Sequence, residues 1–173
     1  MEPLIRPAMV DDLPAILGIY NDVILNSTAA YVYEPHTLEM RRQWFDEHKA
    51  YGWPVIVAVR DGEVVGFGCI GSFRTRPGYK YTGEHTVHVH PAHRGQGVGR
   101  TMLTALIEEA RRLELRTLVS GIDAENEVSI RLHASLGFVE CARMKDVAWK
   151  FGRWLDLVLM QLLLEGPTHP TQK

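Results

Sequence analysis

The strongest constraint on the fold is a junction in the middle of the chain, where a strand pattern, a glycine-rich loop and a helix pattern follow one another. Residues 84–90, EHTVHVH, alternate as a half-buried β-strand does. The loop RGQGVGR comes next, and beyond it apolar residues return at helical spacing. These are Met102, Leu103, Leu106, Ile107, Ala110 and Leu113. The junction predicts a fold in which helices pack on a sheet.

Turn and strand signals on both sides of this junction extend the pattern. Asp61-Gly62 separates PVIVAVR from EVVGFGCIGSF and predicts a β-hairpin. Gly66 and Gly68 within the second of these runs predict a bulge or the close approach of another backbone. Further apolar runs predict strands, and these are LIRPA, RTLVSGI, FVECARM and WLDLVLMQLLL.

Helix signals lie between those runs. Asp11 is expected to cap a helix that has Pro14 in its first turn. Another helix is expected from about Thr37, and another over residues 126–136. Because strands and helices are interleaved without a linker or a repeat, we predict one α/β (α+β) domain over residues 1–165 around a mixed sheet. The segment after it, residues 166–173, is expected to be a flexible tail.

The composition excludes several classes of protein. Of the 173 residues, 46% are hydrophobic, and the formal net charge of −2 gives no basic face for nucleic acid. The longest apolar run, LDLVLMQLLL, contains Asp156 and Gln161 and is too short to span a bilayer. No signal peptide is expected. Cys69 and Cys141 lie in apolar runs, so we expect two buried, reduced thiols and a cytoplasmic protein.

Four histidines at the junction make a metal site the first hypothesis to test. They are His85, His88, His90 and His93, with Glu84 as a further ligand. His85 faces away from His88 and His90, because the side chains of a strand alternate between its two faces. A closed zinc site needs four preset ligands, and no cysteine is nearby. The sequence therefore favours a protein without a bound metal.

The glycine-rich loop fits an anion better than a metal. Gly95, Gly97 and Gly99 remove Cβ atoms, so the backbone could wrap around a phosphate at the start of the helix. Arg94 and Arg100 add positive charge at the rim of the loop. The loop is not a P-loop, because no Gly-Lys-Ser/Thr follows, and its glycine spacing is not that of the dinucleotide fingerprint. A plain glycine turn is the alternative.

This loop and a second segment together resemble a known family. Residues 94–99, RGQGVG, are similar to the [QR]-x-x-G-x-[GA] signature of the GCN5-related N-acetyltransferases, or GNAT proteins. The second signature of that family resembles NEVSIRLHASLGF, residues 126–138. Within the family, IYNDVI, EHTVHVHPAHRGQGVG, LHASLGF and KFGRWLD resemble the phosphinothricin and methionine sulfoximine N-acetyltransferases. The resemblance covers about residues 3–165 and implies a twisted, mostly antiparallel sheet.

The resemblance implies acetyl-CoA as acetyl donor, and no metal. The loop would bind the pyrophosphate, through Arg94, Gly95, Gln96, Gly97, Val98, Gly99 and Arg100. The preceding strand would pair with the pantetheine arm through Val87, His88 and Val89, and the Val89 N–H group would bind the acetyl oxygen. Asn126 would bond the pantetheine amide, although it also fits a helix N-cap. The two valines fit core packing equally well.

Two side chains are candidates for acid–base catalysis. Glu84 matches the presumed general base of the family, which removes a proton from the attacking amine. An exposed glutamate at the end of a strand is the alternative. His133 stands where many family members have a tyrosine that protonates the leaving thiolate, and a histidine could donate to a thiol. A histidine that only satisfies a backbone carbonyl is an equal alternative.

The segment SFRTRPGYKYTG is the candidate substrate loop. A guanidinium can hold a carboxylate through two hydrogen bonds, so Arg74 or Arg76 could select amino-acid-like amines, beside Phe73 and Glu84. A solvated basic loop is the alternative. The opposite wall is expected to come from the first helix and the loop after it, through Tyr20, Tyr31 and Tyr33.

Together these observations predict that the protein is an acetyl-CoA-dependent N-acetyltransferase. Its expected substrate is the α-amino group of a small compound such as methionine sulfoximine, methionine sulfone or phosphinothricin. Acetylation of protein N-termini, as by ribosomal-protein acetyltransferases, is one alternative, and a non-catalytic acyl-CoA sensor is another. The terminal segment KFGRWLDLVLMQLLLE carries more apolar surface than one edge strand usually exposes, and the resembling enzymes are dimers. We therefore expect a symmetric homodimer.

Overall fold

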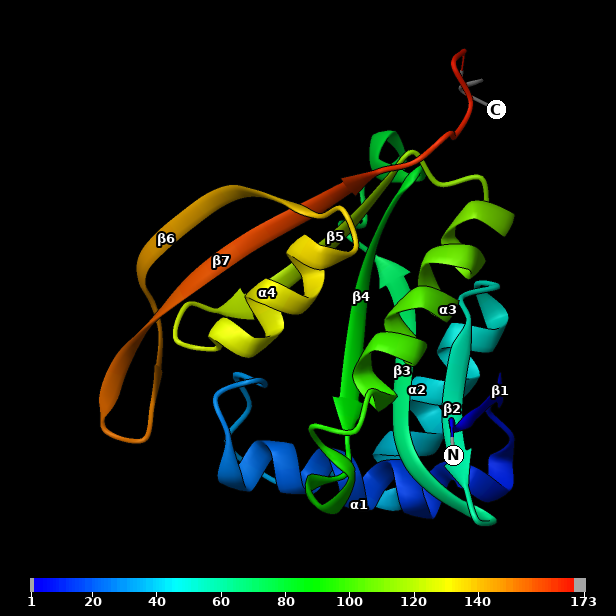
Figure 1. Ribbon diagram of the computed structural model, residues 1–173, viewed down its shortest axis with the longest axis vertical. Coiled ribbons are helices and arrows are strands. Elements are labelled where there is room, and N and C mark those ends of the chain that lie inside the picture. The colour runs from blue at the N-terminus through cyan, green and yellow to red at the C-terminus, as the bar shows by residue number, and fades with distance from the viewer. Residues whose placement is uncertain (1, 170–173) are drawn as a thin grey trace. The chain divides into compact units, whose positions relative to one another are not determined.

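The structure, a computed structural model, describes residues 2–169. In this part of the chain seven strands form one sheet in the order β1-β2-β3-β4-β5-β7-β6. The strands are β1 Leu4–Pro7, β2 Val55–Arg60, β3 Glu63–Ser72, β4 Thr82–Val89, β5 Thr117–Asp123, β6 Val139–Lys150 and β7 Arg153–Leu163. The helices are α1 Leu13–Asn26, α2 Leu38–Ala50, α3 Val98–Arg112 and α4 Glu127–Ser135 (Figure 1). The pair β4–β5 is parallel, and β1–β2, β2–β3, β5–β7 and β6–β7 are antiparallel, so the predicted mixed, mostly antiparallel sheet is confirmed.

The chain forms two compact units. The first comprises the chain up to Ile70 together with Thr86–Leu106, and the second comprises Gly71–His85 and the chain from Ile107 onward. The elements β3, β4 and α3 run from one unit into the other. The part of the predicted tail at residues 170–173 lies outside the described residues.

In the first unit, helices cover both faces of the strands. On one face, α1 and α2 pack against β2 and β3, and the buried residues there are Leu13, Ile16, Ile19, Phe45, Val55, Val57, Phe67 and Cys69. On the other face lies the start of α3, which Figure 1 shows in front of β3, with α2 behind. A Cβ at Gly66 would lie 2.9 Å from the sulfur of Met102 and 3.0 Å from the carbonyl oxygen of His88. The close approach predicted from the strand glycines is therefore confirmed.

The hairpin between β2 and β3 follows its turn residues. Asp61 and Gly62 both have positive φ, 51° and 84°, as a tight two-residue turn of the hairpin type requires. The ladder shifts register between Ala58 and Val59. The extra residue is Val65, so the bulge lies in β3 itself, next to Gly66 in the pair Ala58–Gly66.

The entry to α1 differs from the prediction. A 3₁₀ turn at Val10–Asp12 comes first, and Asp12, not Asp11, stands before the helix. Arg6 donates two hydrogen bonds to the Asp12 carboxylate, at 2.7 and 2.8 Å, and the Met9 N–H donates a third at 2.7 Å. The bonds from Arg6, above all, hold the pKa of Asp12 below its usual value despite burial. The carboxylate thus joins β1 to the helix start, which the capping pattern alone did not show.

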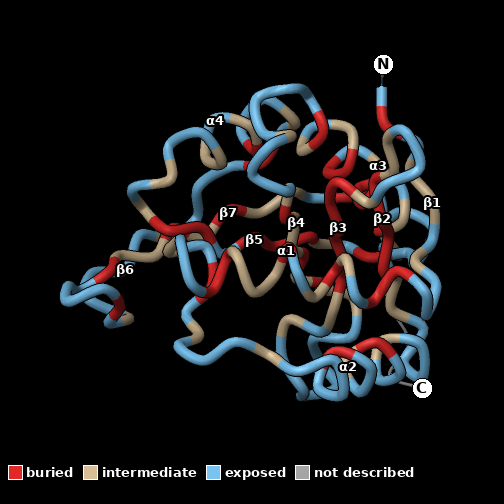
Figure 2. Tube along the Cα trace, turned by 90° about the horizontal axis from the view of Figure 1, so that it is seen from below, coloured by how far each residue is buried: buried red, intermediate tan, exposed pale blue. Residues whose placement is uncertain are grey.

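In the second unit, β5, β7 and β6 form consecutive antiparallel ladders. The β6–β7 hairpin turns at Phe151 and Gly152, both with positive φ, and its ladder shifts register twice. Whereas β2 and β3 of the first unit are largely buried, most of β6 is exposed, as Figure 2 shows. Cys141 lies on β6 and is exposed, so the prediction of two buried thiols is wrong for this one and right for Cys69. Neither forms a disulfide.

The end of the described chain packs against the second unit. The Leu164 N–H donates to the carbonyl oxygen of Arg116 at 2.9 Å, and the Arg116 guanidinium donates back to the Leu164 carbonyl at 3.0 Å. A Cβ at Gly166 would lie 2.7 Å from the backbone of Leu115 and Arg116. The first residue of the predicted tail therefore lies against the body of its unit. No helix within residues 2–169 is long and apolar enough to cross a membrane.

Candidate active site

The glycine-rich loop lies in the first unit and leads directly into α3. Gly95 and Gly97 have φ of 72° and 83°, a conformation that other residues rarely adopt. Gly97 accepts the first helical hydrogen bond, from the Thr101 N–H at 3.1 Å, so the helix begins at Val98. Gly99 therefore belongs to the first turn of α3 and not to the loop. The first amides of a helix carry its partial positive charge and can bind an anion.

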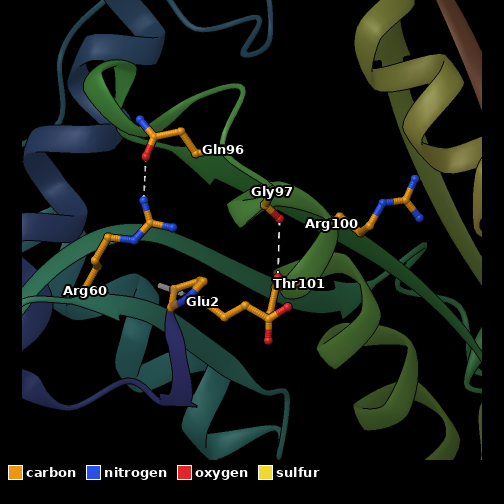
Figure 3. A pocket seen from close by; sticks show the side chains of 7 residues that line it. Glu2, Arg60, Gln96, Gly97, Arg100 and Thr101 are labelled. Atoms are coloured by element: carbon orange, nitrogen blue, oxygen red, sulfur yellow. Dashed lines mark hydrogen bonds between the residues drawn. The ribbon is translucent and has the colours of Figure 1, made fainter.

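The side chains of the loop are anchored on one side. The Arg60 guanidinium of β2 donates to the Gln96 Oε1 atom at 2.6 Å, and the Gln96 amide donates to the Ala92 carbonyl at 3.0 Å. A pocket of about 410 Å³ lies beside these contacts (Figure 3). Its lining residues are Glu2, Pro3, Arg60, Gln96, Gly97, Arg100 and Thr101. Val98 is buried and packs toward Gly66, so its side chain belongs to the core and only its backbone could meet a ligand.

The end of β4 presents two different edges. The His90 N–H donates to the Val65 carbonyl of β3 at 2.9 Å. Because the peptide groups of a strand alternate between its two sides, Val87 and Val89 turn theirs away from β3. The Arg94 Nε–H group donates to the Val89 carbonyl at 3.1 Å, in agreement with that orientation. The Val87 and Val89 amides are therefore directed to the edge of β4 that faces away from β3.

The His88 side chain belongs to the core of the first unit. It is buried, 5.3 Å from the Phe67 ring and 5.8 Å from the Tyr20 ring. Burial, with added repulsion from Arg41 and Arg94, lowers the pKa of His88 to about 4. The imidazole is neutral at physiological pH, and the His88 backbone faces β3, as that of His90 does, and not the edge to which Val87 and Val89 turn.

The predicted tyrosine wall contains a buried cation. The Arg41 guanidinium is centred 4.1 Å from the Tyr20 ring and 4.5 Å from the Trp44 ring, and it bonds the His36 Nδ1 atom at 3.0 Å. Because arginine can only donate, His36 accepts at that nitrogen. Tyr31 and Tyr33, in contrast, are exposed. Of the three tyrosines, Tyr20 thus has a clear packing role.

In the second unit, Glu84 occupies the last pair of the β4–β5 ladder, opposite Val119. Both strands continue beyond this pair, β4 to Val89 and β5 to Asp123. The Glu84 carboxyl is half-buried, and burial raises its pKa, while the Arg74 charge acts in the opposite direction. A carboxylate with a raised pKa is a stronger base, which suits proton removal from an amine.

Space beside Glu84 comes from a glycine on β5. A Cβ at Gly121 would lie 3.5 Å from the Glu84 Oε1 atom and 3.4 Å from the Leu157 Cδ1 atom. Leu159 lies on the same side, 3.8 Å from that Cβ position. The carboxyl therefore stands beside an apolar patch, defined by Gly121, Leu157 and Leu159. The sequence offered one signal for it, a glycine inside a strand, which marks a close approach.

Most of the candidate substrate loop is exposed. Arg74 and Arg76 are exposed. The Arg74 guanidinium lies 5.1 Å from the Phe73 ring, and the Phe73 ring meets the Tyr79 ring edge-on at 5.7 Å. Arg76 precedes a 3₁₀ turn, where its carbonyl accepts from the Tyr79 N–H at 3.0 Å. Of the two arginines, Arg74 is the one whose charge acts on Glu84.

His133 is buried in the second unit with both ring nitrogens in contact with protein atoms. Its Nε2 atom lies 3.0 Å from the Nε2 atom of His85, and its Nδ1 atom lies 2.7 Å from the Ser129 carbonyl oxygen. Phe138 packs against both rings. Burial lowers the pKa of His133, and lowers that of His85 to about 3, so both rings are neutral at physiological pH. His133 thus contacts a backbone carbonyl, as the alternative interpretation of this residue expected. Its role in protonating the thiolate stays a prediction.

Asn126 caps α4. Its side-chain oxygen accepts from the Ser129 N–H at 3.1 Å. The capping alternative is therefore realised, and a bond to pantetheine would have to come from the amide end of the same side chain. Among residues 2–169 no group of three or more His, Cys, Asp or Glu side chains is arranged to hold a metal ion.

Comparisons with known proteins identify the family of the chain. The sequence matches the acetyltransferase (GNAT) family over residues 19–138. An L-methionine sulfoximine/L-methionine sulfone acetyltransferase of Salmonella typhimurium is 44% identical over 166 residues, which cover 96% of this chain and 97% of the relative. A phosphinothricin N-acetyltransferase of Alcaligenes faecalis is 40% identical, with 91% of this chain and 80% of the relative covered.

Solved structures that share the fold include two acetyltransferases of similar sequence. The yncA acetyltransferase of Salmonella typhimurium, solved with its cofactor acetyl-CoA, has a TM-score of 0.96 and 43% identity, with 99% of each chain covered. A ribosomal-protein-alanine N-acetyltransferase of Brucella melitensis has a TM-score of 0.92 and 48% identity, covering 93% of this chain and 99% of the other. The predictions of family, enzyme class and cofactor are confirmed at this level. The chain belongs to the acetyltransferase (GNAT) family.

Proposed function

We propose that this protein transfers the acetyl group of acetyl-CoA directly to the α-amino group of a small amino-acid-like substrate, with Glu84 as general base. Methionine sulfoximine, methionine sulfone and phosphinothricin are the proposed substrates, in line with the names of the relatives. The observation that carries the proposal is the position of Glu84. It is a half-buried carboxyl of raised pKa, and the Val87 and Val89 amides follow three and five residues later on the same strand, beyond its last pair with β5.

The reaction follows from these groups. The amine loses one proton to Glu84, directly or through a water, and its nitrogen then attacks the thioester carbon. Negative charge develops on the acetyl oxygen, where the Val89 N–H group donates a hydrogen bond. The carbon–sulfur bond breaks, and the thiolate takes up the second proton of the attacking amine nitrogen, either directly or relayed through His133. The products are the N-acetyl compound and the free thiol, and the proton on Glu84 returns to solvent.

Acetyl-CoA would be held by backbone more than by side chains. Residues 94–100 offer the positive start of α3 to the pyrophosphate, and Arg100 adds charge beside it. The Gly95 and Gly97 conformations permit that path. The valine amides of β4 would pair with the pantetheine arm, and Asn126 would bond one of its amides.

The substrate would lie between a charge and an apolar patch. Arg74 is the proposed ligand of the α-carboxylate, with Phe73 and Arg76 beside it. The patch of Gly121, Leu157 and Leu159 would receive the side chain of the substrate near Glu84. This arrangement supports an amino-acid-like acceptor.

A panel of amines tests the proposal, with release of the thiol from acetyl-CoA as the readout. We expect turnover with methionine sulfoximine and phosphinothricin and none with polyamines or amino sugars. Glu84→Gln keeps the size of the side chain but cannot accept a proton, so kcat should fall about 10²–10⁴-fold. Turnover of the panel by Glu84→Gln at the wild-type rate would remove Glu84 from the mechanism.

An alanine of a ribosomal protein is the second candidate acceptor, supported by the name of the Brucella melitensis structure. A peptide that begins with alanine belongs in the same panel. A higher kcat/KM for that peptide than for any free amino-acid analogue would favour this candidate.

We also propose a cytoplasmic homodimer. The β6–β7 hairpin exposes Trp149, Phe151 and Trp154 by 47%, 57% and 58%, and the two tryptophan rings meet edge-on at 5.2 Å. Aromatic side chains grouped in this way are typical of a protein–protein interface. The two reduced cysteines suit a reducing compartment.

A further inference from the structure

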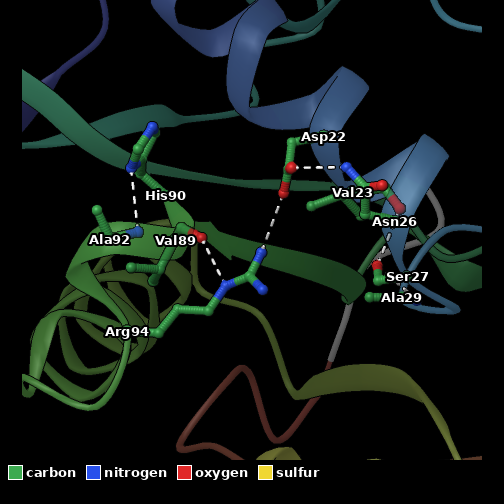
Figure 4. A network of polar contacts seen from close by, with 9 residues as sticks. All are labelled: Asp22, Val23, Asn26, Ser27, Ala29, Val89, His90, Ala92 and Arg94. Atoms are coloured by element: carbon green, nitrogen blue, oxygen red, sulfur yellow. Dashed lines mark hydrogen bonds and ion pairs between the residues drawn. The ribbon is translucent and has the colours of Figure 1, made fainter.

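The first unit contains a polar network that joins α1 to the end of β4 (Figure 4). Arg94 is at its centre. Its Nε–H group donates to the Val89 carbonyl at 3.1 Å, and one of its terminal nitrogens lies 3.4 Å from the Asp22 carboxylate. The Asn26 side-chain amide donates to the other Asp22 oxygen at 2.8 Å. The Arg94 guanidinium is thus directed at the strand end and at α1.

The contact with Val89 fixes one peptide group of the strand. The Val89 carbonyl faces the edge away from β3, where no ladder bond of the described residues meets it. One residue further on, the His90 N–H is held by the Val65 carbonyl at 2.9 Å, and the His90 Nδ1 atom accepts from the Ala92 N–H at 3.3 Å. The strand end is therefore held from both edges, by β3 on one side and by Arg94 on the other.

The position of the Val89 N–H group depends on that hold. The N–H and the carbonyl of one residue point to the same side of a strand, so a bond to the Val89 carbonyl also sets the direction of the Val89 N–H. A displacement of about 1 Å in a group that meets the reacting atoms can reduce the rate about 100-fold. An oxyanion donor must be held rigidly to be effective.

We infer that Arg94 is a positioning residue that orients the Val89 N–H group for acetyl transfer, and that Asp22 of α1 fixes Arg94 in that role. The inference rests on the proposed function, in which this N–H group binds the developing oxyanion. It assigns the Arg94 side chain to the strand end instead of the pyrophosphate, and the loop backbone keeps its proposed part in binding the cofactor. It also assigns a part in the reaction to Asp22, which comes from a distant segment of the chain.

Two acetyl donors separate the positioning role from phosphate binding. Acetyl-CoA contains the phosphates, and S-acetylpantetheine offers the same thioester without them. In Arg94→Ala, kcat should fall about 10–100-fold with both donors, so the ratio of their kcat/KM values stays near that of the wild type. In Arg100→Ala, the acetyl-CoA value should fall selectively, and the ratio with it. A selective loss for acetyl-CoA in Arg94→Ala would overturn the inference.

Conservative variants separate the two contacts of Arg94. Arg94→Gln places an N–H donor the same number of bonds from the backbone as Nε but carries no charge, so it should restore most of the kcat lost in Arg94→Ala. Asp22→Asn should lower kcat only about 1.5–5-fold, since an exposed ion pair is weak. In the Arg94→Gln background the same change should have no effect. Asp11→Asn is the matched control, an exposed aspartate of the same region. Additive losses would refute the link between Asp22 and Arg94.

A spectroscopic readout makes the inference independent of turnover. In ¹⁵N-labelled protein without substrate, the Val89 amide resonance should move in Arg94→Ala and return toward its wild-type position in Arg94→Gln. An unmoved resonance would refute the positioning role. If no amine of the panel is acetylated but the resonance behaves as expected, the proposed function is wrong, whereas the effect of Arg94 on the Val89 N–H group is supported.

Discussion

At the scale of single residues, Glu84 illustrates a conflict between activity and stability. Its carboxyl is half-buried, and burial raises its pKa in the folded protein. A carboxyl whose folded pKa exceeds its unfolded pKa favours folding when protonated and opposes folding when ionised. The ionised form that can act as a base is therefore the form that the fold tolerates less.

This conflict gives a prediction about pH. As pH rises from the unfolded pKa of a glutamate through the raised folded pKa, the wild type should lose stability relative to Glu84→Gln. Paired thermal unfolding of the two proteins at acidic and neutral pH measures the difference. The variant should gain relative stability only at the higher pH. In wild-type kinetics, activity should rise through the same range, and the residual activity of the variant should lack that rise. A pH-independent difference in unfolding would contradict the prediction.

Arg74 gives a second prediction at this scale. Because its side chain is exposed before substrate arrives, Arg74→Ala should leave the stability unchanged. It should raise KM for methionine sulfoximine about tenfold, which corresponds to the loss of one charge-assisted hydrogen bond. The matched substrate is the same compound with its carboxylate amidated, and its KM should barely change. Equal losses for acid and amide would show that Arg74 is part of a solvated rim only.

At the scale of elements, the path from β4 through the loop to α3 was predictable because its signals are local. Alternation, glycines with positive φ and helical spacing all lie within residues 84–113. Contacts between distant segments left no such signal. Asp22 lies 72 positions from Arg94, and His85 lies 48 positions from His133. The sequence therefore suggested His133 and Glu84 as catalytic candidates but not the groups that orient or enclose them.

Helix starts show the same limit. The helix expected from about Thr37 is α2, and Thr37 caps it: the Thr37 hydroxyl accepts from the Met40 N–H at 3.2 Å, a motif that is complete within four residues. At α1 the choice between Asp11 and Asp12 depends on Arg6, which comes from another element. Local capping rules could not distinguish the two aspartates.

The glycine loop supplies the first prediction at this scale. Gly97→Trp would place a bulky side chain at the start of α3, where the pyrophosphate is proposed to bind. Binding of acetyl-CoA should be lost while the circular dichroism spectrum stays that of the folded protein. Isothermal titration calorimetry measures the loss. Because Gly97 has a φ of 83°, some destabilisation is also expected, and Gly52→Ala, at a φ of 72° outside the loop, serves as the control for backbone strain alone.

The strand glycines supply the second prediction. A Cβ at Gly68 would lie 2.9 Å from the Thr86 carbonyl oxygen, which is backbone and cannot move aside easily. Gly68→Ala should therefore lower the free energy of unfolding by about 1–3 kcal/mol, as overpacking of a core does. Gly18→Ala is the control, because its Cβ would meet nothing within 4 Å on α1. That change should raise stability by about 0.5–1 kcal/mol. Denaturant titration compares the two.

At the scale of the whole molecule, the proposed dimer is the prediction to test. Light scattering at micromolar concentration should give twice the chain mass of 19.6 kDa. Trp154→Lys, at a side chain that is 58% exposed in the single chain, should shift the mass toward the monomer without unfolding it. Val128→Lys, on α4 and 71% exposed, is the control and should keep the dimer. A monomeric wild type would contradict the proposal.

The unequal cysteines have a practical consequence for enzymology. Thiol release is measured with reagents that react with any accessible sulfhydryl, and Cys141 is exposed on β6 whereas Cys69 is buried. The protein alone should therefore consume one equivalent of reagent quickly, before any substrate is added. The second equivalent should be consumed only as the chain unfolds. The size of the rapid phase counts the protein chains in the cuvette, and the slow phase reports how fast the core of the first unit opens.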